Sequence, residues 1–366
     1  MVNPTEPSSP ASNRPMVVAA AVLGLIAVAI GALAVRSAMT GPRSAEAAGA
    51  TAERQKGGAS AAAVEAGLEA AATYQRDNRF EQAATILAKL AETNPTDLTV
   101  RRAYAQALLG LKQYDRAYEQ YQAAVSLLPV GSTRQIAQGA DAEAAQLHFE
   151  AGTCATMAGK ADRSIEHYSM AQTANPREPK YPLYLAMVQI KAGTADAESA
   201  AMASLLRAAK LNPELAEAWG TLAELELRRD QLGLAAQHIA EARRLQPAVA
   251  KWRLVEARIL NRRGEAEQAA TLLLALDQAQ RRQPAVLTVL GESYGLLRRP
   301  ADAAKMYADA FAAVAPDGQP NAEFAFQAAL WFERAGDGTS AAKFATSASM
   351  LGHEGARAMA ERLKSK

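Results

Sequence analysis

The chain has 366 residues, which is enough for two ordinary domains or for one extended array of repeats. Almost half of it is hydrophobic (49%) but only 5% is aromatic, and this alanine-rich composition favours closely packed helices. A net charge of +2 gives no basic field of the kind that favours nucleic acid, and the single cysteine, Cys154, excludes an intrachain disulfide and the Cys-x-x-Cys signatures of thiol-redox and c-type haem proteins.

The N-terminal region divides into a polar tail and an apolar segment. Residues 1–15 are rich in proline, serine and asparagine, which predicts a disordered tail. The next stretch, Met16 to Val35, contains no charge, and Arg14 and Arg36 bracket it. A helix of this length spans ~30 Å, the thickness of the hydrocarbon layer of a membrane. We therefore expect a single transmembrane anchor over residues 16–36.

Two other interpretations of the apolar segment stay open, a cleaved signal peptide and a buried helix. The apolar core of a signal peptide is usually shorter, ~7–15 residues, but Ala32-Leu33-Ala34 fits a small-residue cleavage site. The basic residues that follow the segment favour a cytoplasmic C-terminal side when they are counted alone. Because long domains translocate largely regardless of nearby charge, we expect the folded part on the periplasmic side of a bacterial inner membrane.

Residues 37–60 are mostly alanine, glycine and serine with isolated charges, which predicts a flexible linker. Helical patterns begin at about Ala61, and with them a repeat. Ala83 and Ala117 lie 34 residues apart, and so do Pro95 and Pro129. An insertion over residues 130–143 interrupts this period, which then resumes and continues to about residue 350.

The stretch from Leu287 to Pro316 shows the repeating unit most clearly. Its first half places Leu287, Leu290, Gly291 and Tyr294 on one helical face, and its second half places Ala303, Tyr307 and Ala310 on another. This stretch resembles the tetratricopeptide repeat (TPR), with its small residues, its bulky second-helix residue and its closing proline. The resemblance implies an all-α fold: a right-handed TPR solenoid of about eight helix-turn-helix repeats over residues 61–353, with a C-terminal capping helix over 354–366.

The spacing has a physical reason, because neither helix of a repeat can bury its apolar stripe alone. Small residues such as Ala117, Ala235 and Ala303 let the two helices approach closely, and the bulky residue four positions later fills the groove beside them. Paired arginines recur near the predicted helix ends, for example Arg243-Arg244 and Arg298-Arg299. Stabilisation of helix ends explains such pairs better than a basic binding edge does.

Nothing in the sequence indicates catalysis, a cofactor or a metal. The four histidines, His148, His167, His238 and His353, have no metal-ligand spacing, and no Ser/His/Asp set, glycine-rich phosphate loop or zinc-hydrolase motif is present. His167 and His238 occupy the same position of the third and fifth repeats. Since the repeats leave no room for a catalytic domain, we expect a protein that is not an enzyme.

The resemblance also implies a binding surface, because the first helices of such repeats commonly line a groove for an extended or helical peptide. The residues that map to this groove are Phe149, Thr153, Met157, Lys180, Tyr184, Met187, Lys191, Glu224, Arg228 and Arg253. Phe149, Tyr184 and Met187 would either contact a partner or pack between adjacent helices, and the sequence leaves both possibilities open. Lys180 and Lys191 flank this face and could hold an acidic side chain or a C-terminal carboxylate.

These patterns predict a membrane-anchored scaffold that binds a protein or peptide in its groove, in the assembly of an envelope or secretion complex. The expected partners are a protein or peptide and, through the N-terminal helix, the membrane. Nucleic acid and small-molecule substrates are not expected. Two alternatives remain: a subunit that recruits substrate for a separate enzyme, and a structural role through self-association.

Overall fold

The structure is a computed structural model that describes residues 53–128, 141–314 and 321–364. The predicted tail and anchor, residues 37–52 of the predicted linker, and most of the insertion lie outside the described residues. Within the described part of the chain, no helix combines the length and the apolar character that crossing a membrane requires.

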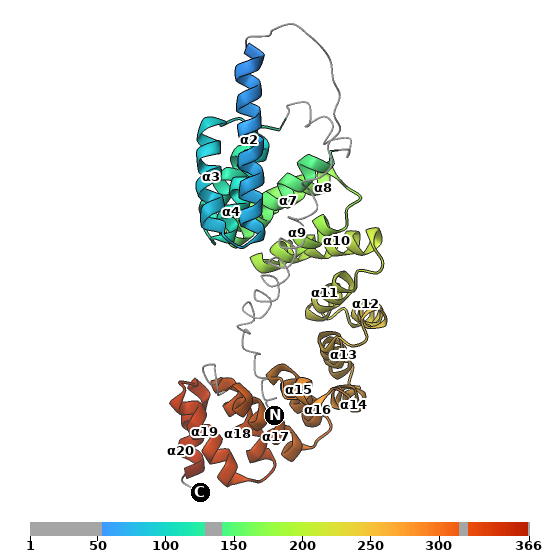
Figure 1. Cartoon of the computed structure of the whole chain (residues 1–366). Coiled ribbons are helices and arrows are strands. Elements are labelled where there is room, and N and C mark those ends of the chain that lie inside the picture. The colour runs from blue at the N-terminus through green and yellow to red at the C-terminus, as the bar shows by residue number, and fades with distance from the viewer. Residues whose placement is uncertain (1–52, 129–140, 315–320, 365–366) are drawn as a thin grey trace. The chain divides into compact units, whose positions relative to one another are not determined.

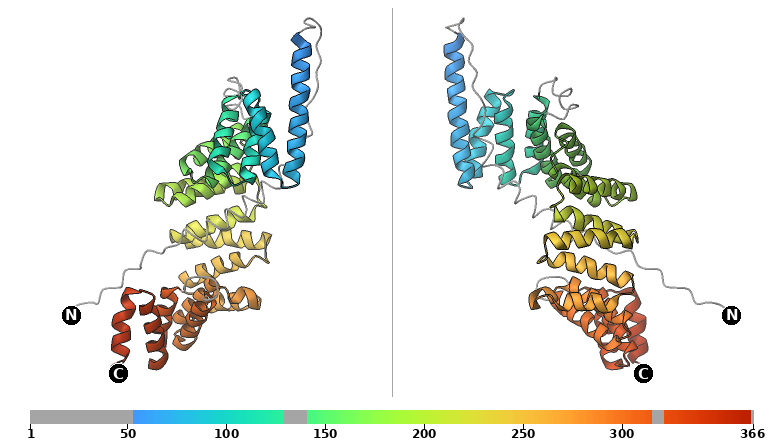
Figure 2. Two further views of the ribbon diagram at one scale, coloured as in Figure 1. Left: turned by 60° about the vertical axis from the view of Figure 1, so that its left-hand side comes forward. Right: turned by 90° about the vertical axis from the view of Figure 1, so that its right-hand side faces the viewer.

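All elements of the described residues are helices, and they fall into two compact units, residues 1–211 and 212–366, each of which is described by itself (Figures 1 and 2). The first unit contains α2 (Glu53–Arg76), α3 (Phe80–Thr93), α4 (Leu98–Gly110), α5 (Tyr114–Ser126), α7 (Ala142–Met157), α8 (Ala161–Ala174), α9 (Lys180–Ala192) and α10 (Ala195–Leu211). The second contains α11 (Ala216–Arg228), α12 (Leu232–Leu245), α13 (Ala250–Arg262), α14 (Ala266–Leu274), α15 (Gln278–Arg281), α16 (Pro284–Leu296), α17 (Pro300–Val314), α18 (Ala322–Arg334), α19 (Gly338–Met350) and α20 (Glu354–Lys364).

Helices that follow one another in the sequence pack as pairs, from α2 with α3 to α18 with α19, and each pair is one predicted repeat. The short helix α15 precedes α16, and α20 packs on α19 at the end of the described chain. One boundary differs from the expectation: α2 begins at Glu53, so the helix includes residues 53–60 of the predicted linker. Glutamate, arginine, glutamine and lysine open this helix, and all four are good helix formers.

A left-handed backbone residue follows the first helix of every described pair. These residues are Asn78, Lys112, Gly159, Gly193, Asp230, Gly264, Arg298 and Gly336, with φ between 56° and 82°. In most pairs the next amide then donates to a carbonyl of the last helical turn, as Gln113 N does to Leu108 O at 2.9 Å. This is the Schellman closure of a helix. The chain therefore turns back in the same way in each repeat.

Small residues allow the two helices of a pair to approach closely. A Cβ atom added at Gly152 would lie 2.9 Å from the ring of Tyr168, and one added at Gly291 would lie 2.7 Å from the ring of Tyr307. Gly67 faces Leu90 of α3 in the same way, at 2.9 Å, and fully buried alanines such as Ala235 of α12 recur along the repeats. The close contacts predicted by the repeat pattern are thus present in the core.

The arginine pairs lie at helix ends, as expected. Arg243 and Arg244 occupy the last turn of α12, and Arg262 the last turn of α13. Several of them also meet carboxylates: Arg262 Nη2 lies 2.6 Å from Asp230 Oδ1, and Arg299 Nε lies 2.7 Å from Asp302 Oδ2. These surface contacts pair the arginines with carboxylates of the same chain. They therefore favour a structural role for the arginine pairs over a basic binding edge.

We predict that Arg298→Gly stabilises the protein, because a residue with a side chain pays a strain of roughly 1 kcal/mol in the left-handed region that glycine avoids. Gly264→Ala, at the matching position of the preceding repeat, should destabilise it by a similar amount. Thermal unfolding followed by circular dichroism measures both changes. A melting temperature that falls for Arg298→Gly would contradict the assigned backbone conformation.

Candidate partner-binding face

Polar side chains connect the first helices of three consecutive repeats in the first unit. Arg102 on α4 donates to both carboxylate oxygens of Glu150 on α7, at 2.8 and 2.5 Å. Glu150 also accepts from Gln146 Nε2 at 2.9 Å, and Gln146 Oε1 accepts from Lys180 Nζ on α9 at 3.0 Å. All four side chains are half-buried. This polar chain fixes the surface that α4, α7 and α9 share.

Beside the polar chain lies an aromatic cluster formed by Phe149, Tyr168, Tyr181 and Tyr184. Phe149 is at its centre, with ring centroids 5.6 Å from Tyr168, 5.6 Å from Tyr181 and 5.0 Å from Tyr184. The Tyr184 ring meets Phe149 edge-on, at 89°. Lys180 Nζ lies 5.1 Å from the centroids of both Phe149 and Tyr181, within the range of a cation–π contact.

The groove residues predicted for the first unit separate by burial. Phe149 and Met187 are only 6% and 7% exposed, so they pack between helices, which was one of the two possibilities that the sequence left open. Thr153 is buried too, and its hydroxyl bonds Phe149 O at 2.9 Å and the Tyr168 hydroxyl at 3.1 Å. Lys180 and Tyr184 are half-buried and Lys191 is exposed. The accessible part of this face is therefore carried by Lys180, Tyr184 and Lys191.

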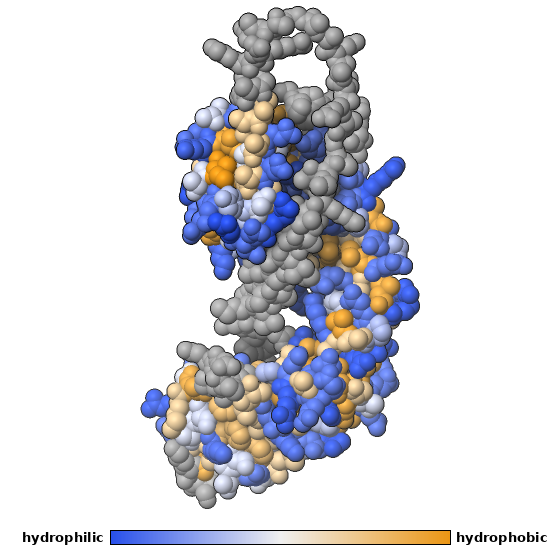
Figure 3. Space-filling view, viewed as in Figure 1, coloured by the Kyte–Doolittle hydropathy of each residue, from blue (hydrophilic) through white to orange (hydrophobic). Residues whose placement is uncertain are grey.

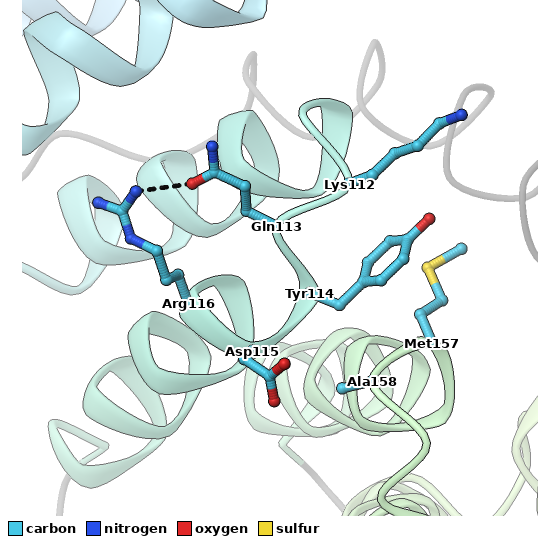
Figure 4. A pocket seen from close by; sticks show the side chains of 7 residues that line it. All are labelled: Lys112, Gln113, Tyr114, Asp115, Arg116, Met157 and Ala158. Atoms are coloured by element: carbon cyan, nitrogen blue, oxygen red, sulfur yellow. Dashed lines mark hydrogen bonds between the residues drawn. The ribbon is translucent and has the colours of Figure 1, made fainter.

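Met157 lies apart from the aromatic cluster, at the end of α7. It lines a shallow pocket of about 410 Å³ beside the turn between α4 and α5, together with Lys112, Gln113, Tyr114, Asp115, Arg116 and Ala158. Figure 4 shows Lys112, Tyr114 and Met157 on one side of this pocket and Arg116, bonded to Gln113, on the other. Met157 thus lines a pocket beside this turn, and its place in the groove stays a prediction.

The three groove residues predicted in the second unit have other neighbours. Glu224 lies 3.5 Å from Lys251 Nζ in an ion pair between α11 and α13, and Arg228 is exposed in the last turn of α11. Arg253 Nη2 donates to Pro247 O at 3.3 Å, six residues earlier. Trp219 donates to Pro213 O in the same way. Arg253 therefore holds the turn that precedes its helix.

A buried hydrogen-bonded chain of Tyr118, His167 and His148 links α5, α8 and α7. His167 Nδ1 lies 3.1 Å from His148 Nδ1, and His167 Nε2 lies 3.3 Å from the Tyr118 hydroxyl, which accepts from Gln122 at 3.1 Å. If Tyr118 donates to His167, then His167 donates to His148, and every bond is satisfied with both imidazoles neutral. The sequence pattern does not predict this chain, since no motif connects histidines on two different helices.

Burial and the opposing imidazole disfavour a charge on this pair. Burial lowers the pKa of His167 to about 4, assisted by His148, and Glu166 only partly offsets this. Burial also lowers the pKa of His148, against the opposing influence of Glu166 and Asp141. A second Nδ1 proton would place two N–H groups face to face. The pair therefore serves as a neutral packing element.

His238, at the repeat position that matches His167, has different neighbours. Its Nδ1 lies 2.9 and 2.8 Å from the two carboxylate oxygens of the buried Glu226, and its ring stacks on Trp219 at a centroid distance of 5.2 Å.

In the first unit, burial raises the pKa of the Cys154 thiol to about 12, which makes it a poor nucleophile. No group of three metal-ligating side chains occurs among the residues that the structure describes.

We predict that acidification destabilises the first unit through His167. Its pKa rises from about 4 in the folded state to 6.5 on unfolding, so the unfolded state binds more protons between these values and stability falls as the pH is lowered. The loss at pH 5 relative to neutral pH is about 2 kcal/mol. Urea unfolding measures it, and His167→Gln should lose less stability over this interval. Equal losses in both proteins would contradict the assignment.

Comparison with known proteins places the fold. No protein-family profile matches the chain, and no curated protein matches it.

Among solved structures, it is similar to a tetratricopeptide repeat protein from Parabacteroides merdae, with 15% identity and a TM-score of 0.53 over 76% of this chain and 98% of that one. The Cut9–Hcn1 hetero-tetramer of the APC/C gives 14% identity and a TM-score of 0.50 over 80% of this chain and 54% of that one. Pseudomonas aeruginosa PilF gives 16% identity and a TM-score of 0.48, over 61% of this chain and 97% of that one. With its stacked helix pairs and close small-residue contacts, the chain has the fold of tetratricopeptide repeat proteins, as its sequence pattern predicted.

Proposed function

We propose that this protein is a membrane-tethered scaffold that binds a protein or peptide on the face shared by α4, α7 and α9. The observation that carries the proposal is the combination of Lys180 and Tyr184 on that face, both half-buried and both resting on the buried ring of Phe149. Aromatic side chains with a charged rim are typical of the centres of protein interfaces.

The face is held in place before any partner arrives. Phe149 is buried against three tyrosines, and the Arg102–Glu150–Gln146–Lys180 chain joins the three helices. Because these side chains are already ordered, little conformational entropy remains to be lost on binding. Such preorganisation suits a docking surface. Arg102 and Glu150 neutralise each other on this face, which favours docking over chemistry.

The membrane tether and the assembly of an envelope or secretion complex belong to the proposal. Its support is the charge-free run from Met16 to Val35 ahead of a fold built for protein contacts. The alternative is a subunit that recruits substrate to a separate enzyme. Both use the same face, so the identity of the captured partner separates them.

The tether is tested by fractionating cells that express the full chain or residues 37–366. We expect the full chain in the membrane fraction, resistant to an alkaline carbonate wash, and the shortened chain in the soluble fraction. A charge near the centre of the segment, as in Leu25→Arg, should weaken insertion, since arginine there costs ~2.5–3.5 kcal/mol. A full-length product that is soluble and begins near Val35 would instead identify a cleaved signal peptide.

The docking face is tested by two tyrosine variants in the first unit. Tyr184→Ala removes the accessible aromatic group on α9 and should weaken binding of a captured partner at least about tenfold, as truncation at an interface centre commonly does. Tyr114→Ala, an equally half-buried tyrosine at the pocket beside Met157, is the matched control and should change affinity little. Isothermal titration gives the affinities.

Circular dichroism separates a binding defect from unfolding in both variants. Since Tyr184 also packs on Phe149 and Tyr168, a small decrease in melting temperature is expected for Tyr184→Ala. If Tyr114→Ala alone weakens the complex, the pocket beside Met157 is the site and the proposed face is wrong. If neither variant weakens it, the partner binds elsewhere.

A further inference from the structure

We infer that the segment bound on this face is acidic, with a carboxylate side chain that pairs with Lys180 and a large apolar side chain that packs on Tyr184. This inference rests on the proposed function, because it names the chemistry of the partner for the same face. It is carried by the contacts of Lys180, by the charges around it, and by its place at the start of α9.

The ammonium group of Lys180 is oriented but not saturated. Its Nζ donates to Gln146 Oε1 at 3.0 Å and lies over the rings of Phe149 and Tyr181. An ammonium group has three donors, and among the described residues one of them meets an oxygen acceptor, Gln146 Oε1. Since the Lys180 side chain is only half-buried, part of it stays accessible for an acceptor that a partner supplies.

The charge of Lys180 is not balanced by an ion pair in the described part of the chain. On the same face Arg102 is neutralised by Glu150 of α7, in a bidentate contact that occupies this carboxylate. Glu178 precedes α9, and its Oε1 accepts from the backbone amide of Lys180 at 3.4 Å. A partner carboxylate would supply the missing counter-charge and form a charge-assisted hydrogen bond.

Stabilisation of the helix does not explain a lysine at this place. Lys180 is the first residue of α9, where the positive end of the helix dipole opposes a cation. Lys191 lies in the last turn of α9, where the dipole favours it, so the helix itself accounts for that residue. Helix α9 contains no aspartate or glutamate. Lys180 is therefore the cation whose position calls for an anion from outside.

Tyr184 extends the site by an apolar contact. It lies one helical turn after Lys180 on the same face, and its ring is held edge-on by Phe149. A segment that places an acidic residue on Lys180 can lay a neighbouring Leu, Phe or Met on this ring. The pairing of a charged and an apolar contact explains why the aromatic cluster and the lysine occur together.

A random peptide library displayed on phage, selected on the full chain in detergent micelles, tests the inference. We expect the selected peptides to be enriched in Asp or Glu next to a large apolar residue. For a selected synthetic peptide, replacing its acidic residue by the matching amide should lower affinity at least about tenfold, and rising salt should reduce the difference. Lys180→Met should abolish the preference for the acid, whereas Lys180→Arg should keep it.

Lys343→Met is the matched control, because Lys343 in the second unit also lies over an aromatic ring, at 5.9 Å from the Phe344 centroid. It should leave the selection unchanged, and melting curves should show that every variant is folded. If the acid preference persists in Lys180→Met, or if peptides bind through Tyr184 with no preference for acid, the inference is overturned while the docking face stands. If no selected peptide depends on Tyr184, the proposed docking face fails as well.

Discussion

The structure depends on the way in which each first helix ends. A left-handed residue follows it, in most pairs the next amide donates to a carbonyl of its last turn, and the second helix packs back on the first. Only then can a small residue such as Gly152 meet a bulky ring such as that of Tyr168. Because this reversal is repeated in every described pair, successive first helices such as α4, α7 and α9 come to share one face, which is the face proposed for docking.

Within the first unit, one buried ring supports both stability and the proposed site. Phe149 fills the core of its repeat and also carries Lys180 and Tyr184 on its outer side. The contact between His148 of α7 and His167 of α8, both neutral, holds the same helix from within. The proposed face is thus a product of packing: few of its groups are accessible, and most of the residues around them hold those few in place.

Much of the fold follows from the sequence, because a strict period leaves little freedom to each repeat. The spacing of Ala83 and Ala117 is sufficient to predict paired helices with close contacts, and the structure contains them.

The side chains of the site are harder to predict, since exposure at a given repeat position depends on the neighbouring repeat. Phe149 is buried because three tyrosines surround it. The same limit applies to His167 and His238, whose matching positions have a histidine and a glutamate as respective partners. Repeat position predicts a groove place for Arg253 and Met157, but it does not predict the bond of Arg253 to Pro247 O or the pocket that Met157 lines.

Hydrogen exchange of the full chain with and without its captured partner tests the central claim most directly, namely that the first helices of the first unit form the docking face. The account predicts that the partner slows exchange in α7 and α9, above all in the turns around Lys180 and Tyr184, and leaves α5 and α8 almost unchanged. Protection confined to the second helices, or to the second unit, would contradict it.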